Sequence, residues 1–206
     1  MKILINRAWE ILWNNRRVFL VLNVLYYGLI LALMIYGIFD APLQNRMLET
    51  NPSTYLSGAL SLNHKTGLDN EVFTTLGMNF LTNLLGASYA EISLPSFIIP
   101  FVGIFLGLYR AALLGIAFSP FHPVIGQIII PHLPTIFIEG QAYILAMLGA
   151  YIHGRAIFWP ASTGQVSRWK AYVDGIRQTG TLYMFIIPVL FISGCYGLIE
   201  TLLLMG

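Results

Sequence analysis

Three ionisable side chains lie inside apolar stretches of the sequence, where a charge is costly. Arg110, Glu139 and Glu200 are each surrounded by runs of hydrophobic residues. A charge in the middle of a membrane helix costs at least about 2.5 kcal/mol on insertion scales, so such residues usually face a partner or a polar cavity. One cation and two carboxylates can form an interhelical ion pair, or they can line a path for a proton or small solute. These three residues are the first candidates for a functional site.

The depth and the helical phase of these residues predict a single cluster. Counted at 1.5 Å per residue from the ends of their apolar stretches, all three lie within about 7–12 Å of the same membrane boundary. Glu139, Tyr143 and His153 share one helical face. The opposite face is apolar and is expected to contact lipid; it carries Leu145, Leu148 and Ile152.

Small and polar residues on the other apolar stretches are expected to face the same interior. Asn79 and Asn83 belong to a polar stripe on one stretch. Gly103 and Gly107 form a G-x-x-x-G pattern, which allows a second helix to approach closely. His132 and His153 are interpreted as interfacial polar groups that support the cluster. The sequence therefore predicts four helices turned toward one polar interior.

Signatures of catalysis and of metal binding are not found in the sequence. Ser193-Gly194 lacks the preceding glycine of a G-x-S-x-G elbow, and neither H-E-x-x-H nor a glycine-rich phosphate loop occurs. His122, His132 and Glu139 are ligand types that suit zinc, but their spacing fits no ligand motif. We therefore expect a non-enzymatic protein with no metal and no cofactor. The single cysteine, Cys195, can form no disulfide within the chain.

The composition predicts that the protein is surrounded by lipid rather than by water. Of 206 residues, 57% are hydrophobic and 10% are charged, and the mean hydropathy is +0.73. Soluble domains carry roughly 25% charged residues, so the composition excludes a water-soluble enzyme, a coiled coil and a disordered regulator. The net charge is only +2, which gives no basic field for nucleic acid. The sequence predicts a membrane protein with the lipid bilayer as its first partner.

The expected fold is an all-α, polytopic transmembrane helix bundle in a single domain, residues 1–206. A bilayer core of roughly 30 Å needs about 20 apolar residues per helix, and five stretches qualify. The run from Pro123 to Pro131 is shorter and is bounded by prolines, so we interpret it as a re-entrant or interfacial segment. The five predicted spans are Val18–Phe39, Val72–Ala90, Leu94–Phe118, Pro134–His153 and Leu182–Met205.

The distribution of Lys and Arg predicts the orientation in the cell membrane. The cations gather in two segments, which five spans would place on the same side. One segment precedes the first span and contains Lys2, Arg7, Arg16 and Arg17; the other lies between the fourth and fifth spans and contains Arg155, Arg168, Lys170 and Arg177. We therefore expect a multi-pass protein with the N-terminus in the cytoplasm and the C-terminus outside.

Three segments outside the spans could meet partners. Residues 1–17 are expected to form an interfacial helix on the inner surface, with Trp9 and Trp13 beside arginines. Residues 154–181 form a second basic amphipathic segment on that side, in which Val166, Trp169 and other apolar residues recur at helical spacing. Residues 40–71 form the outer loop. Both inner segments can act as membrane anchors or as docking surfaces for a cytoplasmic protein.

The order of three stretches resembles the stage II sporulation protein M family of integral membrane proteins. They are NFLTNLLG at 79–86, PHLPTIFIEGQAYILA at 131–146 and IPVLFISGCYGLIETLL at 187–203. In that family a Pro-His-Gly-x-Phe-Glu-like stretch opens one helix, and the last helix carries an Ile-Glu pair. The resemblance extends from about Val72 to the end of the chain, and it assigns Glu139 and Glu200 to the family's pattern.

The resemblance implies a non-enzymatic scaffold or assembly subunit of a membrane protein complex. Its partners would be other membrane or cytoplasmic proteins, and a homo-oligomer stays open. The alternative is a permease-like subunit that moves an ion or small solute through a polar cavity lined by Arg110, Glu139 and Glu200. A fold can host many functions, so the resemblance does not decide between these two expectations. They differ in one observable property, the access of water to Glu139.

Overall fold

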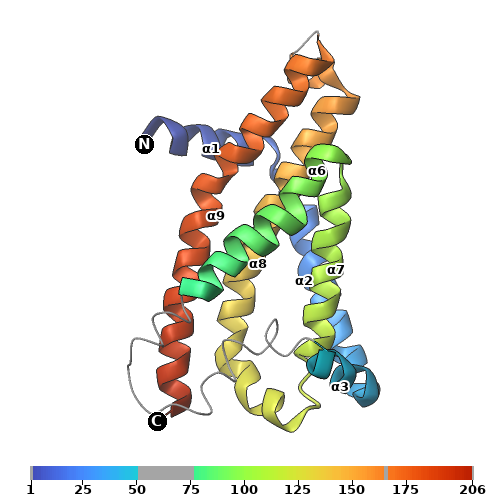
Figure 1. Ribbon diagram of the computed structural model, residues 1–206, viewed down its shortest axis with the longest axis vertical. Helices are drawn as coiled ribbons and strands as arrows, with labels where there is room; N and C mark the ends of the chain where they lie inside the picture. Colours follow the sequence, from blue (N-terminus) through green and yellow to red (C-terminus); the bar gives the residue numbers. More distant parts are fainter. Residues whose placement is uncertain (1, 51–76, 165–166, 206) are drawn as a thin grey trace.

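The computed structural model describes residues 2–50, 77–164 and 167–205, and within these ranges every regular element is a helix (Figure 1). Residues 51–71 of the predicted outer loop and residues 72–76 of the second predicted span lie outside the described residues. The elements are α1 (Lys2–Asn14), α2 (Arg16–Phe39), α3 (Ala41–Thr50), the π-helix η2 (Thr82–Ser93), α6 (Leu94–Ile98), α7 (Val102–Ala117), α8 (Pro123–Phe158), the 3-10 helix η3 (Pro160–Thr163) and α9 (Arg168–Met205).

Three helices in the described residues are long and apolar enough to cross a membrane, which is consistent with an integral membrane protein. They are α2, the part of α8 from Ile125 to Phe158, and the part of α9 from Arg168 to Gly197. The helix α7 is apolar but has only 16 residues. The helical class of the fold is as predicted, but the prediction of five spanning helices is not supported.

One reason for the different count is the position of the turn between the second and third predicted spans. The sequence placed that turn between Ala90 and Leu94, whereas the helical rod continues through η2 into α6. It ends at Ile99, which is extended (φ −115°, ψ 105°) because it precedes Pro100. Phe101 then adopts the left-handed conformation, with φ 68°, and α7 begins. Pro95 is the second residue of α6, directly after η2 in the same rod, and its missing N–H removes one helical hydrogen bond there.

The predicted re-entrant segment is instead the first part of α8. Pro131 and Pro134 lie inside this helix of 36 residues and do not end it. A proline removes one helical hydrogen bond and bends the helix, and neighbouring helices can hold the bend. The Tyr196 hydroxyl of α9 donates to the Pro131 carbonyl oxygen at 3.1 Å. Figure 1 shows the lower part of α8 turning sideways before it joins α7.

The helix α8 lies in the middle of the bundle, and its residues 142–150 are all buried. Of its most apolar window 67% is buried, against 17% in α2 and 22% in α9. The face predicted to contact lipid is therefore buried: Leu145, Leu148 and Ile152 are at most 5% exposed. The prediction was wrong because a stripe of large apolar residues fits a helical neighbour as well as it fits lipid. Here α2, η2, α7 and α9 all pack against α8.

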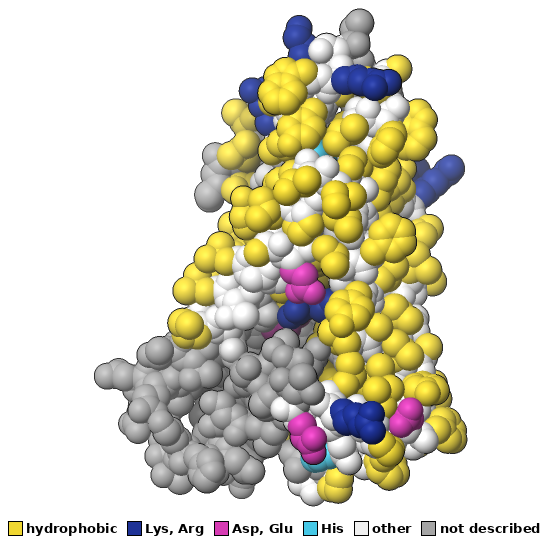
Figure 2. Space-filling view, turned by 45° about the vertical axis from the view of Figure 1, so that its right-hand side comes forward, with side chains coloured by type: hydrophobic (Ala, Val, Ile, Leu, Met, Phe, Trp, Pro, Cys, Tyr) yellow, Lys and Arg dark blue, Asp and Glu magenta, His cyan; other side chains and the backbone are white. Residues whose placement is uncertain are grey.

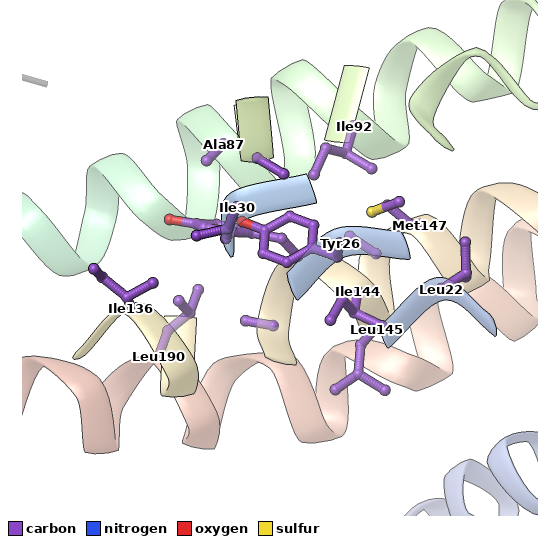
Figure 3. Close-up of a cluster of buried hydrophobic side chains, with 14 of the residues drawn as sticks. Leu22, Tyr26, Ile30, Ala87, Ile92, Ile136, Ile144, Leu145, Met147 and Leu190 are labelled. Carbon is purple, nitrogen blue, oxygen red and sulfur yellow. The ribbon is translucent and has the colours of Figure 1, made fainter. Parts of the chain in front are cut away.

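Figure 3 shows how the neighbouring helices meet α8. Side chains of α2 and η2 point toward one side of α8, and Leu190 of α9 packs on another. Tyr26 of α2 lies at the centre of this group and is fully buried. The residues labelled there are Leu22, Tyr26, Ile30, Ala87, Ile92, Ile136, Ile144, Leu145, Met147 and Leu190.

The two ends of the bundle carry different segments. At one end α1 lies across the other helices, and Trp9 packs edge-on against Phe185 of α9 at 6.5 Å between ring centroids (Figure 1). The hairpin between α8 and α9 rises beyond α1 at this end, where Figure 2 shows Lys and Arg side chains gathered. At the other end lies α3, a helix within the segment that the sequence predicted as a loop without regular structure.

The helix α3 completes the end of α7. Gln44 is fully buried, and its Nε2 donates to the carbonyl oxygens of Ala117 at 3.1 Å and Ser119 at 2.6 Å. The last carbonyls of a helix have no partner within the helix, so they need such donors when they are buried. Gly37 allows this contact, because a Cβ there would lie 2.7 Å from the Ser119 Cβ.

Candidate functional site

The predicted polar residues form a network inside the bundle, which is the candidate functional site. Its centre is Glu139 of α8. The Oε1 atom of Glu139 accepts from Asn83 Nδ2 at 2.8 Å and from Ser193 Oγ at 3.4 Å. The Tyr143 hydroxyl lies 2.9 Å from Asn83 Oδ1 and 3.5 Å from Glu139 Oε2. Because Glu139 and Tyr143 are four residues apart on α8, both project toward Asn83 on η2.

Arg110 reaches this network from α7 through Tyr143. Its guanidinium carbon lies 4.8 Å from the centre of the Tyr143 ring, and its Nη2 is 3.4 Å from the hydroxyl. The acidic partner of Arg110 is Glu91 of η2, with Nη1 and Oε2 3.0 Å apart. Arg110 and Glu139 thus share a neighbour, Tyr143, and belong to one network without forming a direct ion pair.

The Glu91–Arg110 pair lies at the edge of the network. The Glu91 side chain is 33% exposed and the Arg110 side chain 15%. Figure 2 shows acidic and basic side chains together on an otherwise hydrophobic flank, at mid-height of the molecule. Mutual pairing removes much of the cost of placing two charges on an apolar flank.

Glu200 does not join Arg110, although the sequence predicted one cluster of three charges. Its Oε1 lies 2.7 Å from His132 Nδ1, and its Oε2 accepts from Thr135 Oγ1 at 2.9 Å. The His132 ring also stacks on Phe118, with centroids 4.7 Å apart. The reason is that α8 begins before Pro131, so His132 and Thr135 are helical and face α9. The three charges therefore occupy two sites along one face of α8.

His153 lies apart from both sites. It is fully buried between the rings of Phe97, at 5.3 Å, and Tyr172, at 4.9 Å. Gly175 gives it room, because a Cβ there would lie 2.8 Å from His153 Nδ1. The prediction placed His153 on the face of Glu139, but ten residues separate it from Tyr143, and it packs near the α6–α7 turn.

The two glycines of the G-x-x-x-G pattern allow close contacts with two different partners. At Gly103, a Cβ would lie 2.2 Å from the Ile92 carbonyl oxygen, and the Gly103 N–H donates to Ser96 Oγ at 2.8 Å. At Gly107, a Cβ would lie 2.5 Å from the Met147 sulfur. Gly103 thus packs α7 on η2 and α6, and Gly107 packs it on α8.

Sequence reasoning found Asn83 and Tyr143 but missed Glu91 and Thr135. Glu91 was assigned to a turn between spans. The stretch from Ala87 to Leu94 contains neither Gly nor Pro, and this continuity was the signal for a helix through Glu91. Asn79 lies four residues before Asn83 in the same helical rod. Thr135 was hidden by Pro134, which had been interpreted as a helix start.

The chemistry available at these sites is that of protons and hydrogen bonds. In the part of the chain that the structure describes, no three His, Cys, Asp or Glu side chains are placed to hold a metal ion. The groups present are the three carboxyls of Glu91, Glu139 and Glu200 beside hydroxyl, amide and imidazole groups, together with one guanidinium. Such groups can fasten helices to one another, and carboxyl and imidazole groups can also accept and release protons.

Comparisons with known proteins found no matching family model, no similar curated protein and no similar solved structure. The resemblance to the stage II sporulation protein M family therefore rests on the three sequence stretches alone.

Proposed function

We propose that this protein is a non-enzymatic integral membrane scaffold or assembly subunit, as in the stage II sporulation protein M family that its sequence resembles. The observation that carries the proposal is the way the polar side chains of the bundle are used. The carboxyl groups of Glu139 and Glu200 form hydrogen bonds with side chains of neighbouring helices. Such bonds fix the register of apolar helices, which have no hydrophobic driving force toward each other in lipid.

The basic end of the bundle supplies a surface for a partner. At the tip of the α8–α9 hairpin, Phe158, Trp159 and Trp169 are 58%, 60% and 72% exposed. Arg168 and Lys170 are exposed beside them. Exposed aromatic side chains flanked by cations are typical of surfaces that bind proteins or lipid headgroups. In the proposed orientation this tip lies in the cytoplasm, so it would meet a cytoplasmic or peripheral partner.

Purification in mild detergent tests the proposed scaffold function. The tagged wild-type protein is compared with a tip variant, Trp169→Ala with Lys170→Glu, and with a matched lipid-facing variant, Leu25→Ala. We expect a co-purifying protein that the tip variant loses and that the Leu25→Ala variant retains. Recovery of a monomer without any partner would count against the proposal.

A permease-like subunit is the second candidate, and the half-exposed Glu91–Arg110 pair favours it. This pair connects the flank of the bundle to Glu139 through Tyr143, as a polar path would. In a Cys195→Ser background, Glu139→Cys is treated with a membrane-impermeant thiol reagent from outside. Modification supports a water-filled path to position 139, and resistance favours the scaffold.

A further inference from the structure

The network contains one guanidinium near two carboxyl groups. Arg110 pairs with Glu91 at 3.0 Å, and the Tyr143 hydroxyl lies between Arg110 Nη2, at 3.4 Å, and Glu139 Oε2, at 3.5 Å. A single positive charge can neutralise only one of these carboxylates. In the observed arrangement it neutralises Glu91, which is the more solvent-accessible partner of the ion pair.

Glu139 has only neutral donors in the part of the chain that the structure describes. These donors are Asn83, Tyr143 and Ser193, and Glu139 takes no part in the Glu91–Arg110 ion pair or in the His132–Glu200 contact. An ionised carboxylate at membrane depth without a cation is strongly disfavoured, and such a group takes up a proton instead. The protonated carboxyl has one O–H to donate, and the hydroxyl oxygens of Ser193 and Tyr143 lie 3.4 and 3.5 Å from its two oxygens.

Arg110 retains an unused donor. Its Nε–H is buried and has no hydrogen-bond partner among the described residues. A buried donor without a partner costs roughly 1–3 kcal/mol, so the observed arrangement leaves Arg110 incompletely satisfied. A second arrangement, in which the guanidinium turns toward Glu139, is open to it.

We propose that Glu139 is a proton-binding site and that Arg110 exchanges Glu91 for Glu139 when the proton leaves. The step is an acid dissociation: the carboxyl O–H bond breaks, the proton passes to water, and the carboxylate takes the guanidinium as its ion-pair partner. Arg110 stays protonated throughout. Glu91 is then left without its cation at the partly exposed edge of the network.

The surrounding titratable groups fit this assignment. Glu91 faces the network from η2 and Arg110 from α7, while Tyr143 lies on α8 itself. His132 lies about two helical turns before Glu139 on α8. Its Nδ1 is 2.7 Å from Oε1 of Glu200 on α9. Two further phenols come from α2; Tyr26 lies near Tyr143, and Tyr27 donates to the Phe137 carbonyl at 2.7 Å. Arg110 and His132 both act electrostatically on Glu139, and Arg110 is the one that has an unused buried donor.

The experiment is infrared difference spectroscopy of the purified full-length protein in lipid as a function of pH. A protonated carboxyl in a membrane gives its own C=O stretching band, which disappears as the group ionises. We expect such a band in the wild type and its loss in Glu139→Gln. Glu10→Gln, a change of an exposed carboxyl on α1, should leave the band unchanged.

Two further variants test the partner exchange. Glu91→Gln frees Arg110 for Glu139, so the proton affinity of Glu139 should fall by about tenfold or more, since a neighbouring arginine lowers a carboxyl pKa by roughly 1–3 units. Arg110→Gln should raise the affinity. A merely structural role would not shift the midpoint in opposite directions in these two variants.

Defined outcomes overturn the proposal. A wild type without the band contradicts it, as does a band that survives in Glu139→Gln. An unchanged or raised proton affinity of Glu139 in the Glu91→Gln variant contradicts the exchange of partners. This variant retains Glu139, so it tests the exchange even if Glu139→Gln does not fold. None of these spectroscopic measurements depends on a partner protein. The proposed scaffold function can therefore be wrong while the proton-binding site is right, or the reverse.

Discussion

At the scale of single residues, the two buried carboxyl sites differ in the kind of donor that holds them. Glu200 meets an imidazole and a hydroxyl of α8, whereas Glu139 meets an amide and two hydroxyls from three helices. Glu200 thus has an imidazole as its partner, whereas the observed donors around Glu139 are all neutral. The Glu200 site is therefore expected to act as a fastener between α8 and α9, and the Glu139 site to respond to protons.

If the Glu200 site holds α8 and α9 together, His132 and Glu200 should be energetically coupled. In a double-mutant cycle of His132→Phe and Glu200→Gln, we expect about 1 kcal/mol of coupling in detergent unfolding, since hydrogen bonds between membrane helices are worth roughly 0.6–1.7 kcal/mol. The phenyl ring keeps the stacking on Phe118. The same cycle with His122→Phe should show no coupling. A His132 cycle equally close to zero would mean that the observed contact does not hold the helices.

At the scale of elements, the close approach of α7 to η2 and α6 depends on Gly103. The Ile92 carbonyl and the Ser96 hydroxyl occupy the space that a Cβ would need. Both belong to the rod that carries Asn83 and Glu91. The position of α7 therefore fixes the position of Arg110 relative to its acidic partner.

Gly103→Ala tests this packing. The added methyl must displace η2, so we expect a loss of about 1–3 kcal/mol in unfolding free energy, as for overpacked cores. Gly28→Ala is the matched control, because no atom lies within 4 Å of its Cβ position on α2. It should be neutral or slightly stabilising, since alanine favours a helix. Equal stabilities of the two variants in detergent melting would show that η2 yields easily.

The contact between α3 and α7 gives a second prediction at this scale. Gln44→Leu preserves the size of the side chain but leaves the Ala117 and Ser119 carbonyls without their donor. We expect destabilisation of roughly 1–3 kcal/mol, the cost of buried unsatisfied groups. Asn45→Leu, on the exposed side of α3, is the control. The measurement is thermal unfolding in detergent, and a loss shared by both variants would exclude the capping role.

The elements were predictable in part, and the failures have physical causes. The stretch from Val18 to Phe39 in α2 is long and contains no Asp, Glu, Lys, Arg or His, so its helix was predictable. The ends of the other helices were misplaced at Pro95, Pro131 and Pro134. Local rules treat proline as a helix breaker, but the packing of α9 against the bend in α8 overrides them. The faces of α8 were also unpredictable, because apolar side chains do not distinguish lipid from a neighbouring helix.

At the scale of the whole molecule, charges occupy the two ends of a hydrophobic body. The basic segments lie together, around α1 and the α8–α9 hairpin, and Asp40 and Glu49 flank the opposite end at α3. Sequence counting predicted this separation, since it depends only on where cations fall along the chain. The pairing of Arg110 with Glu91 could not be predicted in the same way, because it depends on the position of one turn.

The separation predicts which side of the membrane each end occupies. In a Cys195→Ser background, Arg7→Cys and Lys170→Cys should react with an impermeant thiol reagent from the cytoplasmic side. Asn45→Cys should react from the other side. Val24→Cys, on the exposed apolar face of α2, should not react from either side. Reaction of positions 7 and 170 from opposite sides would refute the orientation.

The enclosed position of α8 has a consequence for how the protein is made. A ribosome synthesises α8 before α9, so the nascent chain enters the membrane with His132 and Thr135 facing the place that α9 has not yet filled. During that interval their partner Glu200 does not exist. Trp9 of α1 is likewise synthesised before its partner Phe185 of α9. Assembly can therefore finish only after translation of α9, and until then a membrane chaperone or the insertion machinery would have to shield the polar face of α8.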